Sequence, residues 1–186
     1  MPTEEVVTGL DRWVSEARTR RGARICIRPL RPDDREREVA FLQALSPRSR
    51  YYRLFVARKV LPRYLIDQLM DVDYVQRMAF AATAIQGGAE QLVGVARYAV
   101  TNQEGGAEFA VSVADSWQRS GVATALMRQL IYYAREHGVR CLTGLILPDN
   151  EAMIALARRL GFSVRYDPAQ HLFVSTEELT VAANAA

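Results

Sequence analysis

The sequence has few of the side chains from which metal centres and disulfide scaffolds are built. Its 186 residues include two cysteines and two histidines. They are Cys26, Cys141, His137 and His171, and no two of them have the spacing of a metal-ligand pair. Each cysteine lies in an apolar run typical of a strand, which predicts buried, reduced thiols rather than a disulfide or a nucleophile. We therefore expect no metal cofactor.

The sequence also lacks a long apolar run and a leader-like start. No segment approaches the roughly 20 consecutive apolar residues of a membrane span, and the acidic, then arginine-rich N-terminus has no apolar h-region. We expect a cytoplasmic protein with no membrane partner. Lysine is scarce, since only Lys59 among the 24 basic residues is a lysine. Arginines suit phosphate and carboxylate partners, although a compositional bias of the genome would give the same count.

The overall composition, 49% hydrophobic and 24% charged residues, is typical of one globular domain. We place this domain at residues 24–175. Residues 1–23 are an N-terminal extension, and their weak amphipathic pattern predicts either a short helix laid on the domain or a tail. Residues 176–186 end in an alanine-rich segment with little to pack, which predicts a C-terminal tail.

The first half of the domain is punctuated by proline and glycine. Residues 24–29 alternate as an opening strand would. Helices are expected after Pro32, at Ser46-Pro47, where serine is the N-cap and proline the first helical residue, and after Pro62. Three strands separated by glycine turns then predict an antiparallel meander, at residues 78–85, 91–100 and 107–113.

The second half has a different pattern, in which helices and strands alternate. Residues 121–137 have the four-residue apolar spacing of a long helix, closed by Gly138. An apolar strand over 139–147, a helix over 150–160 and a hairpin over 162–174 follow. A strand, a long helix and an apolar strand in succession form a βαβ crossover, so those two strands should be parallel. The predicted fold class is α/β with one mixed sheet, an antiparallel meander continuing into a parallel crossover, and helices on both faces.

The segment that carries chemistry lies between the third meander strand and the long helix, and reads Gln118-Arg119-Ser120-Gly121-Val122-Ala123. A helix N-terminus offers unpaired N–H groups and a partial positive charge to a phosphate, and Gly121 allows close approach of the backbone. Taken alone, the hexapeptide is equally a tight start to a helix. The P-loop and dinucleotide-binding patterns are absent from the sequence.

In its order of elements and in this motif, the chain resembles the GNAT family of acyl-CoA-dependent N-acetyltransferases over residues 24–175. The resemblance implies that the loop matching [Q/R]-x-x-G-x-[G/A] cradles the pyrophosphate of acetyl-CoA, the co-substrate. It implies that a bulge splays the third meander strand, whose backbone binds the pantetheine arm, and that an asparagine of the last helix reaches the cofactor, or is simply its N-cap. The implied cofactor-binding residues are Val111, Ser112, Val113, Gln118, Arg119, Ser120, Gly121, Val122, Ala123, Thr124 and Asn150.

A narrower resemblance concerns the acceptor. Residues 46–55, 107–111 and 153–162 resemble the acetyltransferase domain of bacterial protein lysine acetyltransferases. The implied reaction moves an acetyl group to an amine, and a protein lysine is the favoured acceptor. A small-molecule amine and a non-catalytic acyl-CoA sensor stay open. The basic and aromatic residues of 48–59 suit acceptor or CoA contacts, with a solvated helix face and a nucleic-acid surface as alternatives. Monomer and homodimer are both compatible with the sequence.

Glu108 is the candidate general base. A lysine ammonium must lose a proton before it attacks a thioester at neutral pH, and Glu108 begins the strand that leads to the cofactor loop, on the same side as Ala110 and Ser112. Backbone N–H groups near 111–113 would polarise the thioester carbonyl. At the position of Ala157, many GNAT enzymes carry a tyrosine that protonates the leaving thiolate. Tyr133 and Tyr166 are possible substitutes, although core packing suits each of them as well.

Overall fold

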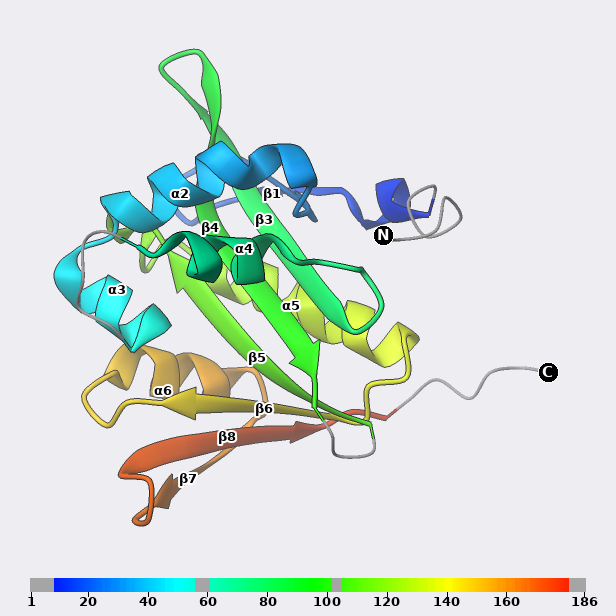
Figure 1. Cartoon of the computed structure of the whole chain (residues 1–186), viewed down its shortest axis with the longest axis vertical. Helices are drawn as coiled ribbons and strands as arrows, with labels where there is room; N and C mark the ends of the chain where they lie inside the picture. Colours follow the sequence, from blue (N-terminus) through cyan, green and yellow to red (C-terminus); the bar gives the residue numbers. More distant parts are fainter. Residues whose placement is uncertain (1–8, 56–60, 102–104, 181–186) are drawn as a thin grey trace.

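A computed structural model describes residues 9–55, 61–101 and 105–180. Its centre is an eight-stranded sheet in the order β1-β2-β3-β4-β5-β6-β8-β7 (Figure 1). Only β5 and β6 pair in parallel, and every other neighbouring pair is antiparallel. The strands are β1 (Ser15–Arg18), β2 (Arg24–Pro29), β3 (Arg77–Gln86), β4 (Ala89–Val100), β5 (Gly106–Val113), β6 (Cys141–Ile146), β7 (Ser163–Asp167) and β8 (Leu172–Glu178).

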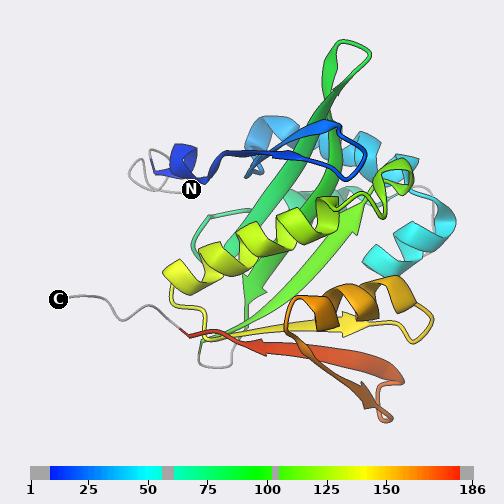
Figure 2. The ribbon, with the colours of Figure 1, turned by 180° about the vertical axis from the view of Figure 1, so that it is seen from behind.

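Helices cover the two faces of this sheet, as the sequence predicts. One face carries α2 and α4, and Figure 2 shows α5 and α6 on the other. Helix α3 begins where predicted, because the Ser46 hydroxyl accepts from the N–H of Ser49 and Pro47 is its first residue. The helices are α2 (Arg35–Ala44), α3 (Pro47–Leu54), α4 (Arg63–Met70), α5 (Val122–Glu136) and α6 (Glu151–Arg159), with short 3-10 turns η1 (Leu10–Trp13), η2 (Pro32–Asp34) and η3 (Asp115–Trp117).

The N-terminal residues differ in part from the sequence prediction. Residues 10–13 are a 3-10 turn and residues 15–18 form strand β1, which pairs antiparallel with β2. The short 3-10 helix, with Trp13 buried in the core, agrees with the predicted short helix laid on the domain, but strand β1 was not predicted. A four-residue strand is too short for its alternation to be distinguished from a weak helical pattern, and its partner strand supplies the missing stability.

The C-terminal end of the sheet also holds more than predicted. Strand β8 runs to Glu178, and Leu179 is buried, so residues expected in a tail belong to the packed structure. β8 forms the predicted hairpin with β7, but it also pairs with β6 and so lies between the two.

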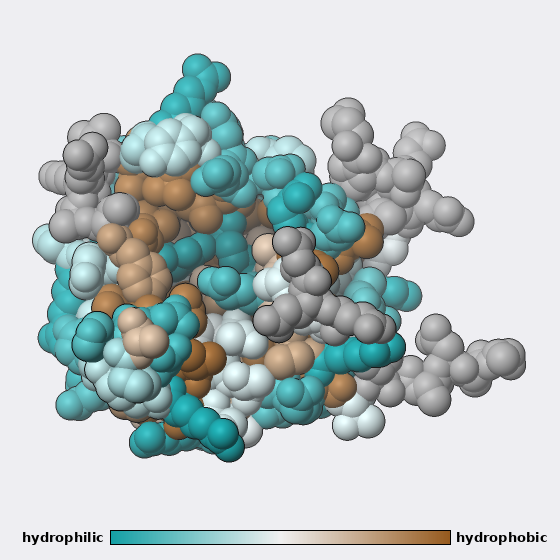
Figure 3. Space-filling view, turned by 60° about the horizontal axis from the view of Figure 1, so that its bottom comes forward, coloured by the Kyte–Doolittle hydropathy of each residue, from teal (hydrophilic) through white to brown (hydrophobic). Residues whose placement is uncertain are grey.

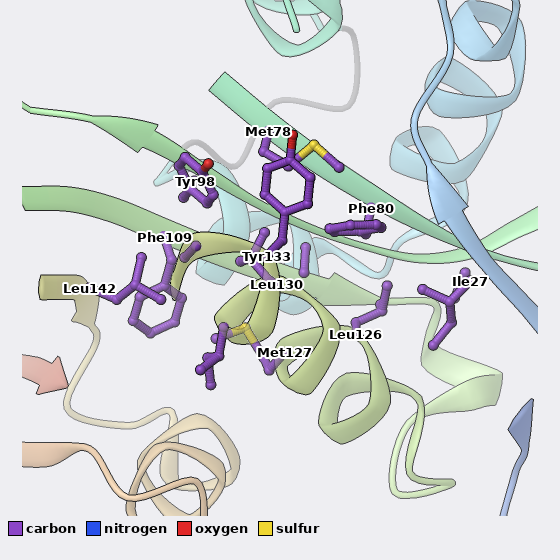
Figure 4. Close-up of a cluster of buried hydrophobic side chains, with 14 of the residues drawn as sticks. Ile27, Met78, Phe80, Tyr98, Phe109, Leu126, Met127, Leu130, Tyr133 and Leu142 are labelled. Carbon is purple, nitrogen blue, oxygen red and sulfur yellow. The ribbon is translucent and has the colours of Figure 1, made fainter. Parts of the chain in front are cut away.

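Two clusters of buried apolar side chains hold the helices to the sheet. The larger packs α5 and α6 on one face, where the aromatic ring of Tyr133 lies among Phe80, Tyr98 and Leu130 (Figure 4). The smaller packs α2 and α4 on the other face, against Ala79, Ala81 and Val95 among others. The period-two alternation of β3 and β4 serves both clusters at once, which is why their sequence is almost continuously apolar.

Within the described residues, no helix is long and apolar enough to cross a membrane. The same residues contain no group of three or more histidine, cysteine, aspartate or glutamate side chains placed to hold a metal. Cys26 and Cys141 are both free. They are partly exposed rather than buried as predicted, because each occupies an outward position of its strand. Burial still raises the pKa of Cys26, ahead of the opposing effect of Arg28.

Candidate active site

The parallel seam between β5 and β6 is short, and its end opens the candidate site. Pairing begins at Gly106–Cys141 and stops at Glu108–Thr143. Beyond this point the strands diverge, so that β5 continues along β4 while β6 continues along β8, and Figures 1 and 2 both show the resulting V between them. Figure 3, which brings the bottom of the molecule forward, shows hydrophilic surface in a hollow bordered by apolar surface.

The ring of Phe109 lies where the strands part. A Cβ added to Gly144 would lie 2.6 Å from two ring atoms of Phe109, so this ring occupies the side-chain space that Gly144 leaves empty. Phe162 packs on its other side, with ring centroids 5.0 Å apart. The expected bulge in the strand of 111–113 is not found: β4 and β5 pair without a register shift, and the irregularity lies between β3 and β4 at Ala82/Thr83.

We expect Gly144→Ala to destabilise the fold by about 1–3 kcal/mol, because the new methyl group overpacks against a buried ring. Urea unfolding followed by circular dichroism measures this loss. A second variant that combines Gly144→Ala with Phe109→Leu should recover part of the stability, since leucine gives way at the contact. Additive losses in the double variant would show that the new methyl group does not clash with the ring.

The edge of β5 that faces the V carries free backbone donors. The N–H of Ala114 bonds the carbonyl of Val93 in β4 at 2.9 Å. Because donors alternate between the two edges of a strand, the N–H groups of Val111 and Val113 point the other way, toward β6. β6 has already diverged there, so no ladder bond in the described part of the chain uses these donors. The slot thus offers a row of amides to an extended ligand.

The loop after β5 ends in an open helix N-terminus. Arg119 and Gly121 both have positive φ, 59° and 99°, and Gly121 is the N-cap of α5 without any side-chain cap. The first intrahelical bond is from Ala125 N–H to the Gly121 carbonyl, which leaves the amides of Val122, Ala123 and Thr124 for a ligand. An added Cβ at Gly121 would meet only Arg20 Cγ, at 3.8 Å.

Hydrogen bonds from α3 hold this loop. The amide of Gln118 donates to the carbonyl of Val113 at 3.2 Å and to Ser49 Oγ at 3.1 Å. Asp115 accepts from the N–H and hydroxyl of Ser46 and from the hydroxyl of Ser49. Although burial raises the pKa of Asp115, these bonds outweigh it and lower the pKa overall. The hydroxyl of Ser120 turns inward to the carbonyl of Trp117.

The same helix reaches the other arm of the V. The hydroxyl of Tyr52 donates to Asp149 Oδ2 at 2.9 Å, and Arg48 Nε to the Tyr52 hydroxyl at 2.6 Å. Asp149 precedes Asn150, whose side chain accepts from the N–H of Met153 and so is the N-cap of α6. Helix α3 therefore spans the open end of the V and links its two arms, an arrangement that the sequence did not predict.

Two further contacts complete the rim. The turn between β1 and β2 docks on the loop, because the N–H of Arg20 donates to the carbonyl of Ser120 at 2.8 Å and Arg21 reaches the Ser116 carbonyl. Across the V, Arg159 of α6 donates to Thr124 Oγ1 at 3.1 Å. The arginine-rich N-terminal segment thus lies beside the start of α5, a position that nothing in its own sequence predicts.

Glu108 lies at the point where the strands part. Its side chain is exposed and shares a face with Ala110 and Ser112, while Phe109 and Val113 are buried on the other face. The predicted alternation is thus confirmed. Ser112 Oγ is buried and, in the described part of the chain, has no hydrogen-bond partner. Because buried hydroxyls usually have a hydrogen-bond partner, this one is available to bind a ligand.

The two tyrosines considered as proton donors, Tyr133 and Tyr166, make other contacts. Tyr133 is buried and donates to the carbonyl of Tyr74 at 2.6 Å, and burial raises its pKa to about 12. Tyr166 lies on β7, packed against Phe173 and within 3.3 Å of His171. Ala157, at the usual tyrosine position, is buried in α6. Neither tyrosine is therefore placed to protonate a leaving thiolate in the slot.

Comparison with known proteins decides the family. The model of the Acetyltransferase (GNAT) family matches residues 48–162, more than half of the chain and all of the elements that form the V. The chain belongs to the GNAT family. It is an acetyl-CoA-dependent N-acetyltransferase, and its relatives carry names of this kind.

Two relatives and one structure illustrate the similarity. The chain is 42% identical over 158 residues to Acetyltransferase PA5475 of Pseudomonas aeruginosa, covering 85% of this chain and 84% of that protein. It is 32% identical to Acetyltransferase Pat of Mycolicibacterium smegmatis over 143 residues, 76% of this chain but 42% of that longer protein. The GNAT domain of S. lividans PAT superposes with a TM-score of 0.81 at 29% identity, covering 90% of this chain and 98% of that one.

The residues of this GNAT chain fit acetyl-CoA. A diphosphate suits the uncapped start of α5, where Gly121 leaves the backbone accessible. An extended pantetheine arm with its two amides suits the edge of β5, and the unpartnered Ser112 hydroxyl lies beside it.

Proposed function

We propose that the chain acetylates lysine side chains of proteins, with Glu108 as the general base. The observation that carries this proposal is the place of Glu108, exposed at the last pair of the parallel seam, next to the row of free β5 amides. Acetyl-CoA supplies the activated acetyl group as a thioester. We assign the diphosphate to the amides of Val122, Ala123 and Thr124, and the pantetheine arm to Val111 and Val113.

The residues of the chain then transfer protons and stabilise the charge that develops in the reaction. Glu108, directly or through water, takes a proton from the lysine ammonium, and the neutral amine attacks the thioester carbonyl as the C–S bond breaks. The amide that forms loses a second proton. One of the two protons neutralises the leaving thiolate and the other passes to solvent. The N–H of Val111 points into the V, where it would stabilise the negative charge that develops on the carbonyl oxygen.

A protein acceptor is supported by the open surface beside Glu108. Register partners on neighbouring strands project to the same face, and Glu108 pairs with Thr143, Thr143 with Thr176, and Thr176 with Ser163. This polar row crosses a face of β6, β8 and β7 that the described helices leave uncovered (Figure 1). A depression of about 310 Å³ lies there, lined by Ser163, Arg165, Val174, Thr176 and Glu178. An open face suits a polypeptide better than a small amine, which needs an enclosed pocket.

The proposal is tested by thiol release from acetyl-CoA with a panel of acceptors. We expect turnover with folded proteins and lysine-containing peptides, and little with spermidine, kanamycin or free amino acids other than lysine. Mass spectrometry should locate the acetyl group on lysine Nζ. Turnover on the small amines alone would replace the protein acceptor by a small one, and tight CoA binding without turnover on any amine would leave only a sensor.

A further inference from the structure

Helix α3 carries two arginines, Arg50 and Arg53, on its inward side. Arg50 is buried and donates to the carbonyls of Leu42 and Leu45, so this side of α3 faces inward. Arg53 lies three residues later on the same side, and α3 packs against β5. There this arginine lies in the electrostatic field of three charged side chains, namely those of Arg97, Glu38 and Glu108.

Two of these charges already neutralise each other. Arg97 donates to Glu38 Oε1 at 2.7 Å and to the carbonyl of Leu69 at 2.5 Å, and Glu38 is buried. Arg53 has no such partner: within the described residues it makes no hydrogen bond and no ion pair. Burial, and next the charge of Arg97, lower its pKa to about 10. A half-buried guanidinium without an anion is costly to the fold.

Glu108 and Arg53 are thus a carboxylate and a guanidinium close enough to interact electrostatically, and no hydrogen bond or ion pair joins them in the described part of the chain. Register places Arg97 opposite Ala110 and Ala99 opposite Glu108, so Arg97 and Glu108 lie on the same face of the sheet, next to α3. A ligand with an ammonium for Glu108 and a carboxylate for Arg53 would satisfy both. A neutral or purely cationic acceptor would leave Arg53 unpaired.

We propose that Arg53 is the anion-binding subsite of the acceptor groove, and that the acceptor carries a carboxylate close to its reactive amine. The carboxylate has two sources, an acidic side chain next to the lysine or the α-carboxylate of lysine itself. This inference rests on the proposed function and names its substrate class. Charge-assisted bonds to a guanidinium contribute roughly 1.5–3 kcal/mol, which corresponds to about a 10- to 100-fold preference.

Matched acceptors test the subsite. N-acetyl-Asp-Lys-amide is compared with N-acetyl-Asn-Lys-amide, and free lysine with lysinamide, at saturating acetyl-CoA. We expect a KM about 10- to 100-fold lower for one carboxylate-bearing member, and the pair in which this occurs identifies the source. Arg53→Gln should abolish this preference with the KM for acetyl-CoA unchanged, and Arg53→Lys should restore part of it.

The outcomes separate the two proposals. Equal KM values within both pairs, or an Arg53→Gln variant that loses kcat equally on every acceptor, would overturn the subsite while turnover upholds the acetyltransferase. Should no acceptor turn over, calorimetric titration of the four acceptors into the CoA complex of Glu108→Gln measures the same preference directly. Loss of the preference in the variant that also carries Arg53→Gln supports the subsite, and its persistence refutes it.

Discussion

Replacing Glu108 by glutamine is expected to lower kcat by about 10²- to 10⁴-fold, the contribution of a positioned general base. The amide has almost the shape of the carboxylate, so packing at the end of the parallel seam is preserved, but it cannot accept a proton from the acceptor ammonium. Because the substitution leaves the amides of β5 and α5 in place, the Kd for CoA should change little. Thiol release measures the first effect and calorimetry the second.

Glu36→Gln is the matched control, since Glu36 is an exposed glutamate in the first turn of α2 and is not part of the seam. Its kcat should equal that of the native chain. Raising the pH should rescue Glu108→Gln in part, because more of the acceptor amine is then already neutral. A Glu108→Gln enzyme with native kcat at neutral pH would remove Glu108 from the mechanism and leave deprotonation to water.

The second large effect concerns the loop that begins α5. Gly121→Val is expected to weaken CoA binding by about 100-fold. Gly121 has a φ of 99°, which a β-branched residue does not tolerate, so the loop must change its conformation and turn its amides away from the diphosphate. Losing two charge-assisted bonds of about 1.5 kcal/mol each gives roughly this factor. Calorimetry with CoA measures the change.

Gly138→Val is the control for the general strain of such a substitution. Gly138 ends the same helix, has a φ of 77°, and an added Cβ there meets nothing within 4 Å. Both variants should lose a similar amount of unfolding free energy, about 1–3 kcal/mol, yet only Gly121→Val should lose affinity. Equal affinities in the two variants would mean that the start of α5 does not bind the phosphates.

Much of this architecture is readable from local patterns. Alternation assigns Phe109 and Glu108 to opposite faces, and the Ser46-Pro47 and Gly138 signals fix helix ends, because each depends on neighbours a few residues away. The cofactor loop is local in the same sense. Its glycine, its polar first residue and the helix that follows lie within one short segment, which is why a motif can represent it.

The remaining features depend on contacts between distant residues. Nothing near Ser15 reveals that it pairs with Ile27, and nothing in the last hairpin tells that β8 takes the place beside β6. The wedge of Phe109 against Gly144 and the bridge from Ser46 to Asp115 join residues 35 and 69 positions apart. The role proposed for Arg53 depends on the packing of α3 against the sheet, which the neighbouring sequence does not indicate.

The position of β8 has a consequence for how the chain is made. Strands β2 to β5 can pair in the order in which they leave the ribosome, but β6 and β7 must wait with open edges until Leu172–Glu178 is synthesised and enters between them. Open edges are templates for pairing with other chains. A nascent chain halted before Leu172 would therefore expose one edge of β6 and both edges of β7, and synthesis of Leu172–Glu178 pairs the edge of β6 and one edge of β7.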